Sequence, residues 1–162
     1  MKYEIKHIAP KYAQGCYDVQ HSGGEFQELT SGLWSLDTWK FISHNCNDTF
    51  IITDENDRVL GYWFGIIQVC NIDYDKERHG KLSCCAIDVC VHKELRSTGI
   101  MNEVMKTVCD YHESIFTWTH VDNVIAQNIM EKYGFIQHSR RKDWFAPGED
   151  SYYYTFDRKN YE

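Results

Sequence analysis

The chain of 162 residues lacks any hydrophobic run that approaches the length of a membrane span. A spanning helix needs about 20 consecutive, mostly apolar residues. The N-terminal stretch MKYEIKHIAP also has no long hydrophobic segment that could serve as the core of a signal peptide. These absences argue against a membrane protein and predict a cytoplasmic one.

The sequence also lacks internal repeats, low-complexity tracts and linker segments. Its 162 residues suit one domain with a single substantial core. Hydrophobic residues make up 43% of the chain and aromatic residues 15%, which is the composition of a folded globular protein. We expect residues 1–162 to form a single domain.

Clustered basic residues are nearly absent, and the net charge is −7. Nucleic-acid phosphates are bound by clustered Lys and Arg, so a nucleic-acid partner is not expected. The one basic cluster, residues 140–142, is expected on a solvated strand face. An acidic, aromatic-rich protein favours a cationic small molecule, such as an amine.

The seven cysteines are odd in number and lack C-x-x-C spacing, which argues against a disulfide framework. Cys84, Cys85, Cys90 and His92 lie close together in the sequence. Adjacent residues of a strand point to opposite faces, however, and cannot share a tetrahedral zinc site. We expect buried, reduced thiols and no metal.

Hydrophobic periodicity and turn residues predict alternating strands and helices. The expected strands are 3–8, 49–53, 59–69, 82–91, 114–119, 135–144 and 151–156, and the expected helices are 11–20, 36–44, 99–112 and one from 122 or 123 to 134. The strands at 82–91 and 114–119 flank a helix, so they should be parallel with a right-handed crossover. The expected fold class is α/β (α+β mixed sheet), a mostly antiparallel seven-stranded sheet with a central parallel β-α-β unit and about four helices.

The most informative segment is the turn that joins the strand at 82–91 to the helix at 99–112. It contains Arg96 and Gly99, and the helix begins at once. The first N–H groups of a helix have no partner inside it and carry the positive end of its dipole. A pyrophosphate is a natural ligand for such a place.

Two sequence blocks resemble the GNAT superfamily of acyl-CoA-dependent N-acetyltransferases. RSTGIM at 96–101 is similar to the family's R/Q-x-x-G-x-G/A pyrophosphate loop, and NVIAQNIMEKYGF at 123–135 is similar to its N-x-x-A-x-x-L-Y-E-K-x-G-F helix. The order and separation of the blocks also agree with the family. Two positions depart from it, because Met101 replaces a small residue of the loop and Met130 replaces the tyrosine that commonly acts as the acid.

The resemblance implies that acetyl-CoA is the co-substrate and that its arm lies between the strands at 82–91 and 114–119. Backbone N–H groups of residues 87–91 are then the implied donors to the thioester oxygen. The implied cofactor-binding residues are Val89, Cys90, Val91, Arg96, Ser97, Thr98, Gly99, Ile100, Met101, Asn123, Ala126 and Met130.

The catalytic candidates are His120, Asp88 and Tyr133. Relatives often carry a glutamate base at positions that here are approximately Cys85 and Trp118, so His120 and Asp88 are the nearby titratable alternatives. A free histidine titrates near pH 6.5, which suits a base that acts directly or through water. A structural hydrogen-bonding role is the alternative for His120, as core packing is for Tyr133.

The sequence therefore predicts an N-acetyltransferase that transfers an acetyl group from acetyl-CoA to a primary amine of a small molecule, by direct attack in a ternary complex. A catalytically silent acyl-CoA-binding regulatory domain is the alternative, and a covalent route through Cys90 or Cys85 is a third reading. A homodimer is left open. Aromatic residues that either line an acceptor pocket or belong to the core are Tyr12, Tyr17, Trp34, Trp39 and Trp63.

Overall fold

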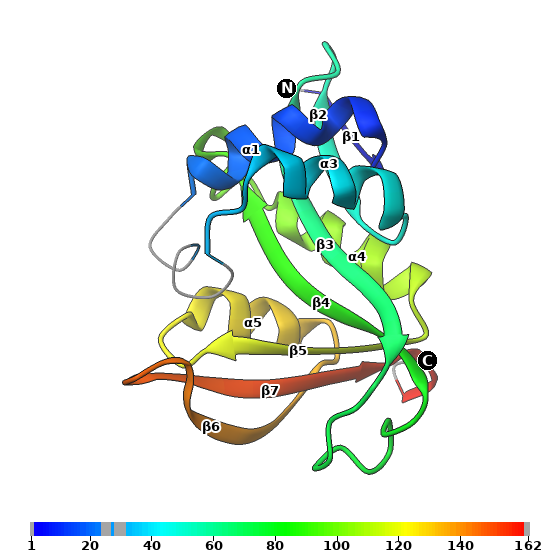
Figure 1. Ribbon diagram of the computed structural model, residues 1–162, viewed down its shortest axis with the longest axis vertical. Helices are drawn as coiled ribbons and strands as arrows, with labels where there is room; N and C mark the ends of the chain where they lie inside the picture. Colours follow the sequence, from blue (N-terminus) through cyan, green and yellow to red (C-terminus); the bar gives the residue numbers. More distant parts are fainter. Residues whose placement is uncertain (1, 24–26, 28–31, 161–162) are drawn as a thin grey trace.

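The computed structural model describes residues 2–23, 27 and 32–160, and its seven strands form one sheet in the order β1-β2-β3-β4-β5-β7-β6 (Figure 1). The strands are β1 (Tyr3–His7), β2 (Phe50–Asp54), β3 (Val59–Val69), β4 (Leu82–Val91), β5 (Ser114–His120), β6 (Ile136–Ala146) and β7 (Glu149–Asp157). The α-helices among the described residues are α1 (Ala13–His21), α3 (Leu36–Asn45), α4 (Ile100–Tyr111) and α5 (Val124–Lys132). Short 3₁₀ turns η1, η2 and η3 cover Pro10–Tyr12, Lys93–Leu95 and Arg158–Asn160.

All neighbouring strands are antiparallel except β4 and β5, which are parallel. The connection from β4 to β5 runs through α4, so it is the expected β-α-β unit. The mixed-sheet fold expected from the sequence is confirmed.

The helices cover both faces of the sheet. Val19 of α1 and Trp39 of α3 pack with Tyr62 of β3 on one face. Val104 of α4 and Met130 of α5 pack with Trp63 of β3 on the other face. The two faces therefore have separate hydrophobic cores, and neighbouring residues of β3 contribute to each of them.

Most helix ends follow from local sequence. The side chain of Asn123 accepts a hydrogen bond from the N–H of Ala126 at 3.3 Å and caps the start of α5. Just beyond the end of α5, Gly134 has a φ of 83°, the left-handed conformation that glycine adopts most cheaply. Both features were expected from the sequence. The helix expected at 11–20 is partly different, since Pro10 starts a 3₁₀ turn and α1 begins at Ala13.

The hairpin of β6 and β7 is longer than expected, because its strands run up to the two turn residues Pro147 and Gly148. Ala146 pairs with Glu149 across this turn. A tight turn needs few residues outside the ladder, so the hairpin carries Phe145 and Glu149 as strand residues. The sequence predicts these two residues in the connection between strands 135–144 and 151–156.

The cysteines are free thiols, as expected. Cys84 packs in the core beneath α4, whereas Cys85 packs on the opposite face with Phe116 and Tyr153. No group of metal-binding side chains occurs within the part of the chain that the structure describes. Among the same residues, none of the helices has the length and apolarity to cross a membrane.

Candidate active site

The parallel strands β4 and β5 separate shortly after they meet. Among the described residues they pair only at Cys84 with Ile115 and at Cys85 with Phe116. The hydroxyl of Thr117 donates to the carbonyl of Ala86 at 2.8 Å, beyond the last register pair. From there the strands diverge, as Figure 1 shows. The rest of β4 is left without a register partner on β5.

A β-bulge lies on β4 where this separation begins. Phe64 of β3 pairs with Asp88 and Gly65 pairs with Ala86, so Ile87 is an extra residue on β4. A bulge bends its strand and changes the alternation of side chains. The side chain of Asp88 therefore faces α1, on the face opposite to Cys84.

The three predicted cofactor residues of β4 differ in orientation. Cys90 is buried against α1, and its thiol donates to the carbonyl of Val19 at 3.5 Å. Val91 packs partly against the core beneath α4, and Val89 is 38% exposed. Only the backbone of Cys90 can therefore face a ligand in the opening, whereas Val89 can offer its side chain.

The loop before α4 has the backbone of an anion site. Ser97 and Gly99 have φ values of 64° and 83°. Among the described residues, the N–H groups of Gly99 and Met101 meet no protein acceptor. Successive N–H groups around left-handed residues form a concavity that binds anions. Thr98 is held in this loop by a 2.6 Å hydrogen bond from its hydroxyl to the carbonyl of Leu95.

Side chains of the same loop differ in exposure. Arg96 is exposed, Met101 is partly buried, and Ile100 is buried in the core beneath α4. The predicted contribution of Ile100 to a ligand is thus limited to its backbone. Arg96 remains available to a phosphate from the solvent side.

The other predicted wall of the cleft is α5. The Asn123 amide oxygen is engaged in the cap, whereas Ala126 is partly exposed. Met130 is 8% exposed, and its sulfur accepts a weak hydrogen bond from the Thr119 hydroxyl at 3.7 Å. A thioether cannot donate a proton, so this position has no acid.

Tyr133 points to the first turns of α4. Its hydroxyl donates to the Asn102 side chain at 3.3 Å, and Lys132 donates to the same oxygen at 2.8 Å. We call the loop from Ser97 to Met101 the anion loop. The structure therefore places Tyr133 beside the anion loop and not with the residues at the end of β5.

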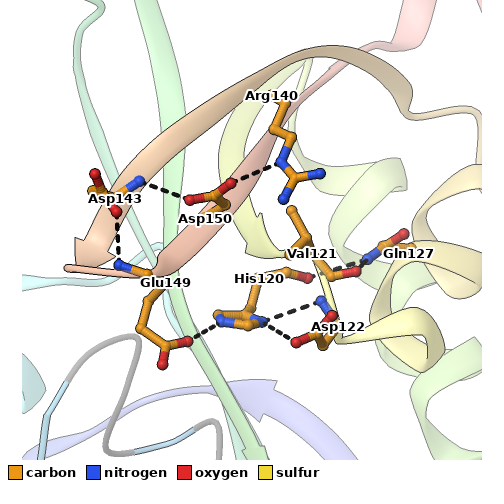
Figure 2. Close-up of polar contacts among 9 residues, drawn as sticks. His120, Val121, Asp122, Gln127, Arg140, Asp143, Glu149 and Asp150 are labelled. Carbon is orange, nitrogen blue, oxygen red and sulfur yellow. Dashed lines mark hydrogen bonds and ion pairs between the residues drawn. The ribbon is translucent and has the colours of Figure 1, made fainter.

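His120 lies at the end of β5 and is 3% exposed. Its Nδ1 accepts the backbone N–H of Asp122 at 3.1 Å, and its Nε2 contacts the carboxylate of Glu149 (Figure 2). The neutral ring must then carry its proton on Nε2 and donate it to Glu149. The Glu149 side chain is 32% exposed and is the more accessible member of this pair.

Hydrogen bonds from Gln127 also fix the backbone carbonyls next to the His120 side chain. The Gln127 amide donates to the carbonyls of His120 and Val121 at 3.1 and 2.8 Å, which ties α5 to the end of β5 (Figure 2). A third contact joins Asp150 to Arg140 at 2.8 Å in the adjoining hairpin. The histidine and the carboxylate are therefore positioned from three elements.

Asp88 is buried among neutral donors. Its carboxylate accepts from the hydroxyl of Tyr62 at 2.6 Å, from Gln27 at 2.6 Å and from Gln20 at 3.2 Å. Burial first, and the Asp88 charge second, raise the pKa of Tyr62 well above its usual range. The network links β3, β4 and α1, which favours a structural role for Asp88.

A cavity of about 350 Å³ opens beside the bulge, and we call it the aromatic pocket. Strands β4, β5 and β6 contribute its walls, which are Cys85, Ala86, Ile87, Trp118, Trp144 and Phe145. The ring of Phe145 stacks at 6.0 Å on that of His120. The pocket therefore adjoins the pair of His120 and Glu149.

The aromatic residues singled out from the sequence are mostly elsewhere. Tyr12, Trp39 and Trp63 are buried in the two cores. In the basic cluster Arg140 and Lys142 are exposed, as expected, whereas Arg141 is partly buried and lies 3.3 Å from the centre of the Tyr74 ring. Strand pairing across the sheet, which local sequence does not specify, decides which aromatic rings reach the pocket.

Glu149 is the residue of the site that sequence reasoning missed. It lies 29 positions from its partner His120 and reaches it through the β5–β7 register, in which His120 pairs with Ser151. A usable signal is Pro147-Gly148, which marks a tight turn and puts Glu149 at the start of a strand. The pairing of β7 with β5 also had to be known.

Comparison with known families places this geometry in context. The model of the acetyltransferase (GNAT) family matches residues 13–135. No curated protein matches the chain.

Several solved structures share the fold at low sequence identity. NAA60 of Arabidopsis thaliana, in complex with a bisubstrate analogue, is 11% identical with a TM-score of 0.78, over 96% of this chain and 98% of that one. A chimera of spermidine N-acetyltransferase SpeG from Vibrio cholerae and hSSAT is 14% identical with a TM-score of 0.75, over 99% and 98%. The NatC complex bound to Gag peptide and CoA is 16% identical with a TM-score of 0.72, over 97% and 99%.

Proposed function

The chain belongs to the acetyltransferase (GNAT) family, a family of acyltransferases, and from this membership we propose that it transfers an acetyl group from acetyl-CoA to a primary amine of a small molecule. The similar structures include a spermidine acetyltransferase and a complex with a peptide. The fold therefore leaves the acceptor open, and the acceptor has to be argued from the site.

In this proposal the pyrophosphate of acetyl-CoA binds the loop from Ser97 to Met101. The left-handed backbone at Ser97 and Gly99 and the N–H groups of Gly99 and Met101 support this placement. Arg96 adds a cation at the solvent side. Val89, Val91 and Ala126 are the proposed neighbours of the pantetheine arm, which reaches the bulge of β4.

Transfer proceeds by direct attack in the ternary complex. The neutral amine nitrogen bonds to the thioester carbon, and the negative charge on the oxygen is stabilised by backbone N–H groups of β4 between 87 and 91. The tetrahedral intermediate then collapses, the C–S bond breaks, and CoA leaves as a thiolate. Met130 supplies no proton, so water protonates the thiolate.

The pair of Glu149 and His120 is the proposed base. Glu149 faces the substrate directly or through one water, and His120 fixes the carboxylate through its Nε2 proton. The proton lost by the amine passes to this pair. Asp88 serves the fold in this scheme, and Tyr133 supports the anion loop.

The observation that carries the proposal is the separation of β4 and β5 after Cys85 and Phe116. It opens the sheet between the anion loop and the pair of Glu149 and His120. The test is to incubate the protein with acetyl-CoA and a panel of primary amines, and to measure free CoA and the acetylated product.

The silent-domain alternative rests on two observations: Met130 stands where relatives carry an acid, and Cys85 and Trp118 stand approximately where relatives carry a glutamate base. It predicts acetyl-CoA binding without CoA release for every amine. The covalent alternative predicts an acetylated protein when acetyl-CoA is added alone. Burial raises the pKa of both Cys85 and Cys90 to about 12, which disfavours the reactive thiolate.

A further inference from the structure

We propose that the acceptor is a small primary amine carrying an aromatic ring, and that this ring binds in the aromatic pocket. This inference rests on the proposed acetyl transfer and names the substrate class of the same site. The pocket volume of about 350 Å³ lies at the lower end of the range for small-ligand sites. One ring with a short side chain is a ligand of suitable size.

The side chains that line the pocket are mostly apolar. Its six wall residues include three aromatic side chains and no charged one. A planar ring gains contact area against such walls and can stack on an indole. A second ammonium group of a polyamine would lose its hydration there without gaining a carboxylate, which is unfavourable.

The aromatic walls are held in position before any ligand arrives. The Trp118 indole N–H donates to the Tyr74 hydroxyl at 3.0 Å, and the Arg141 guanidinium lies over the Tyr74 ring. Trp144 stacks on Trp118, with ring centres 4.7 Å apart and planes at 20°. Because the rings are already ordered, little conformational entropy is lost on binding.

The amine end of the ligand has a place beside the ring. Phe145 lines the pocket and stacks on His120, whose Nε2 contacts Glu149. The exposed carboxylate of Asp122 lies 3.9 Å from the Nδ1 of the same histidine. An ammonium group next to the ring therefore meets negative charge, while the ring meets apolar walls. A short linker between ring and amine fits this geometry.

The experiment compares amines that share one primary amine and differ in the attached group. 2-Phenylethylamine carries a ring, putrescine carries a second ammonium, and a phenylalanyl-alanine dipeptide carries the ring on a peptide N-terminus. Steady-state CoA release gives kcat/KM for each amine with the wild type, Trp144→Ala and the control Phe41→Ala. Phe41 is a 65% exposed ring on α3, remote in the sequence from every pocket residue.

We expect 2-phenylethylamine to have a higher kcat/KM than putrescine by about tenfold or more, because ring stacking in a desolvated pocket adds binding energy. Trp144→Ala should raise the KM for 2-phenylethylamine by about tenfold with a smaller change in kcat, since it removes binding and not chemistry. Phe41→Ala should keep the wild-type preference.

A putrescine value equal to or above that of 2-phenylethylamine overturns the proposal. A ring preference that survives Trp144→Ala also overturns it. A dipeptide that exceeds 2-phenylethylamine would assign the pocket to a peptide N-terminus and would overturn the small-molecule class.

Calorimetry separates the failure of this proposal from that of acetyl transfer. If no amine releases CoA, acetyl transfer fails, and 2-phenylethylamine is titrated into the protein saturated with CoA. Binding that is lost in Trp144→Ala but kept in Phe41→Ala supports the ring site without any chemistry. Absence of binding to the wild type overturns it.

Discussion

Gly99 combines two physical roles, because its backbone is left-handed and its N–H faces the proposed pyrophosphate. A Cβ at this position would meet only the side-chain nitrogen of Asn102, at 3.8 Å. Substitution therefore costs mainly backbone strain, about 1–2 kcal/mol for an L-residue in this conformation. The same backbone strain can be introduced at another left-handed glycine, which then serves as a control.

We expect Gly99→Ala to weaken acetyl-CoA binding strongly, since the added methyl group and the shifted loop disturb the N–H groups that hold the phosphates. Gly80→Ala is the control, with a φ of 77° and open space around its Cβ. Calorimetry gives the affinity and urea unfolding the stability. If Gly99→Ala and Gly80→Ala lose the same stability and bind acetyl-CoA with the same affinity, the anion loop is not the pyrophosphate site.

The pair of His120 and Glu149 is expected to act as one unit. Glu149→Gln and His120→Ala should each lower turnover by about two to four powers of ten, with little change in acetyl-CoA affinity. The double variant should be scarcely slower than either single one. Asp88→Asn is expected to reduce stability more than turnover, because its carboxylate accepts hydrogen bonds from buried donors.

The pH profile tests the same pair. The rate should rise with pH as the acceptor amine becomes neutral, and Glu149→Gln should change the shape of this profile because it removes the proposed proton acceptor. Both proteins are measured with the same amine. Glu113→Gln, an exposed glutamate at the far end of β5, is the control. Normal turnover of Glu149→Gln would leave water or the substrate as the base.

At the scale of elements, much of the fold could be predicted from the sequence. The apolar runs with few charges at 59–69 and 82–91, the apolar face of α4 and the glycine at 134 that ends α5 are local signals, and each agrees with the structure. The bulge at Ile87 could not be predicted in this way. The bulge leaves no mark in the residue types of β4. Only the pairing register of β4 with β3 shows that Ile87 is an extra residue.

The candidate site also has a part that local sequence predicts and a part that depends on strand pairing. The anion loop was predictable, since Arg96 and Gly99 lie within one turn and open a helix. The partner of His120 was not, because Glu149 reaches it through the pairing of β7 with β5. Site residues that depend on sheet register need the structure, whereas those inside one loop do not.

The face of α5 toward the opening can be tested by a bulky substitution. Ala126 is partly exposed and lies one helical turn before Met130, which packs beneath the sheet. Ala126→Trp should block the pantetheine arm and abolish acetyl-CoA binding while the fold persists. Asn128→Trp, on the exposed side of α5, should bind normally. Normal binding by both variants would show that α5 does not border the cofactor.

At the scale of the whole molecule, stability should depend on pH through His112. Burial lowers the pKa of His112, whose ring packs against Trp63 and Tyr111. The unfolded chain binds this proton at a pH of about 6.5, whereas the folded chain does so only at lower pH. The neutral His112 ring therefore contributes fully to stability above a pH of about 6.5, and this contribution is lost as the pH falls below that value.

We expect the free energy of unfolding in urea to decrease as the pH is lowered from about 6.5 toward 5. His112→Phe keeps an aromatic ring and should remove part of this decrease. His44→Phe, an exposed histidine of α3, is the control. An unchanged slope in His112→Phe would assign the pH dependence to other groups.

The burial of the thiols has a practical meaning for any thiol-detecting assay. Six of the seven cysteines are buried and Cys46 is partly exposed, so the folded protein should react slowly with an alkylating or chromogenic reagent. The CoA released in turnover is small and fully accessible. Released CoA can thus be followed by its thiol with little signal from the cysteines of the protein. A sudden increase in the cysteine signal indicates that the protein has unfolded.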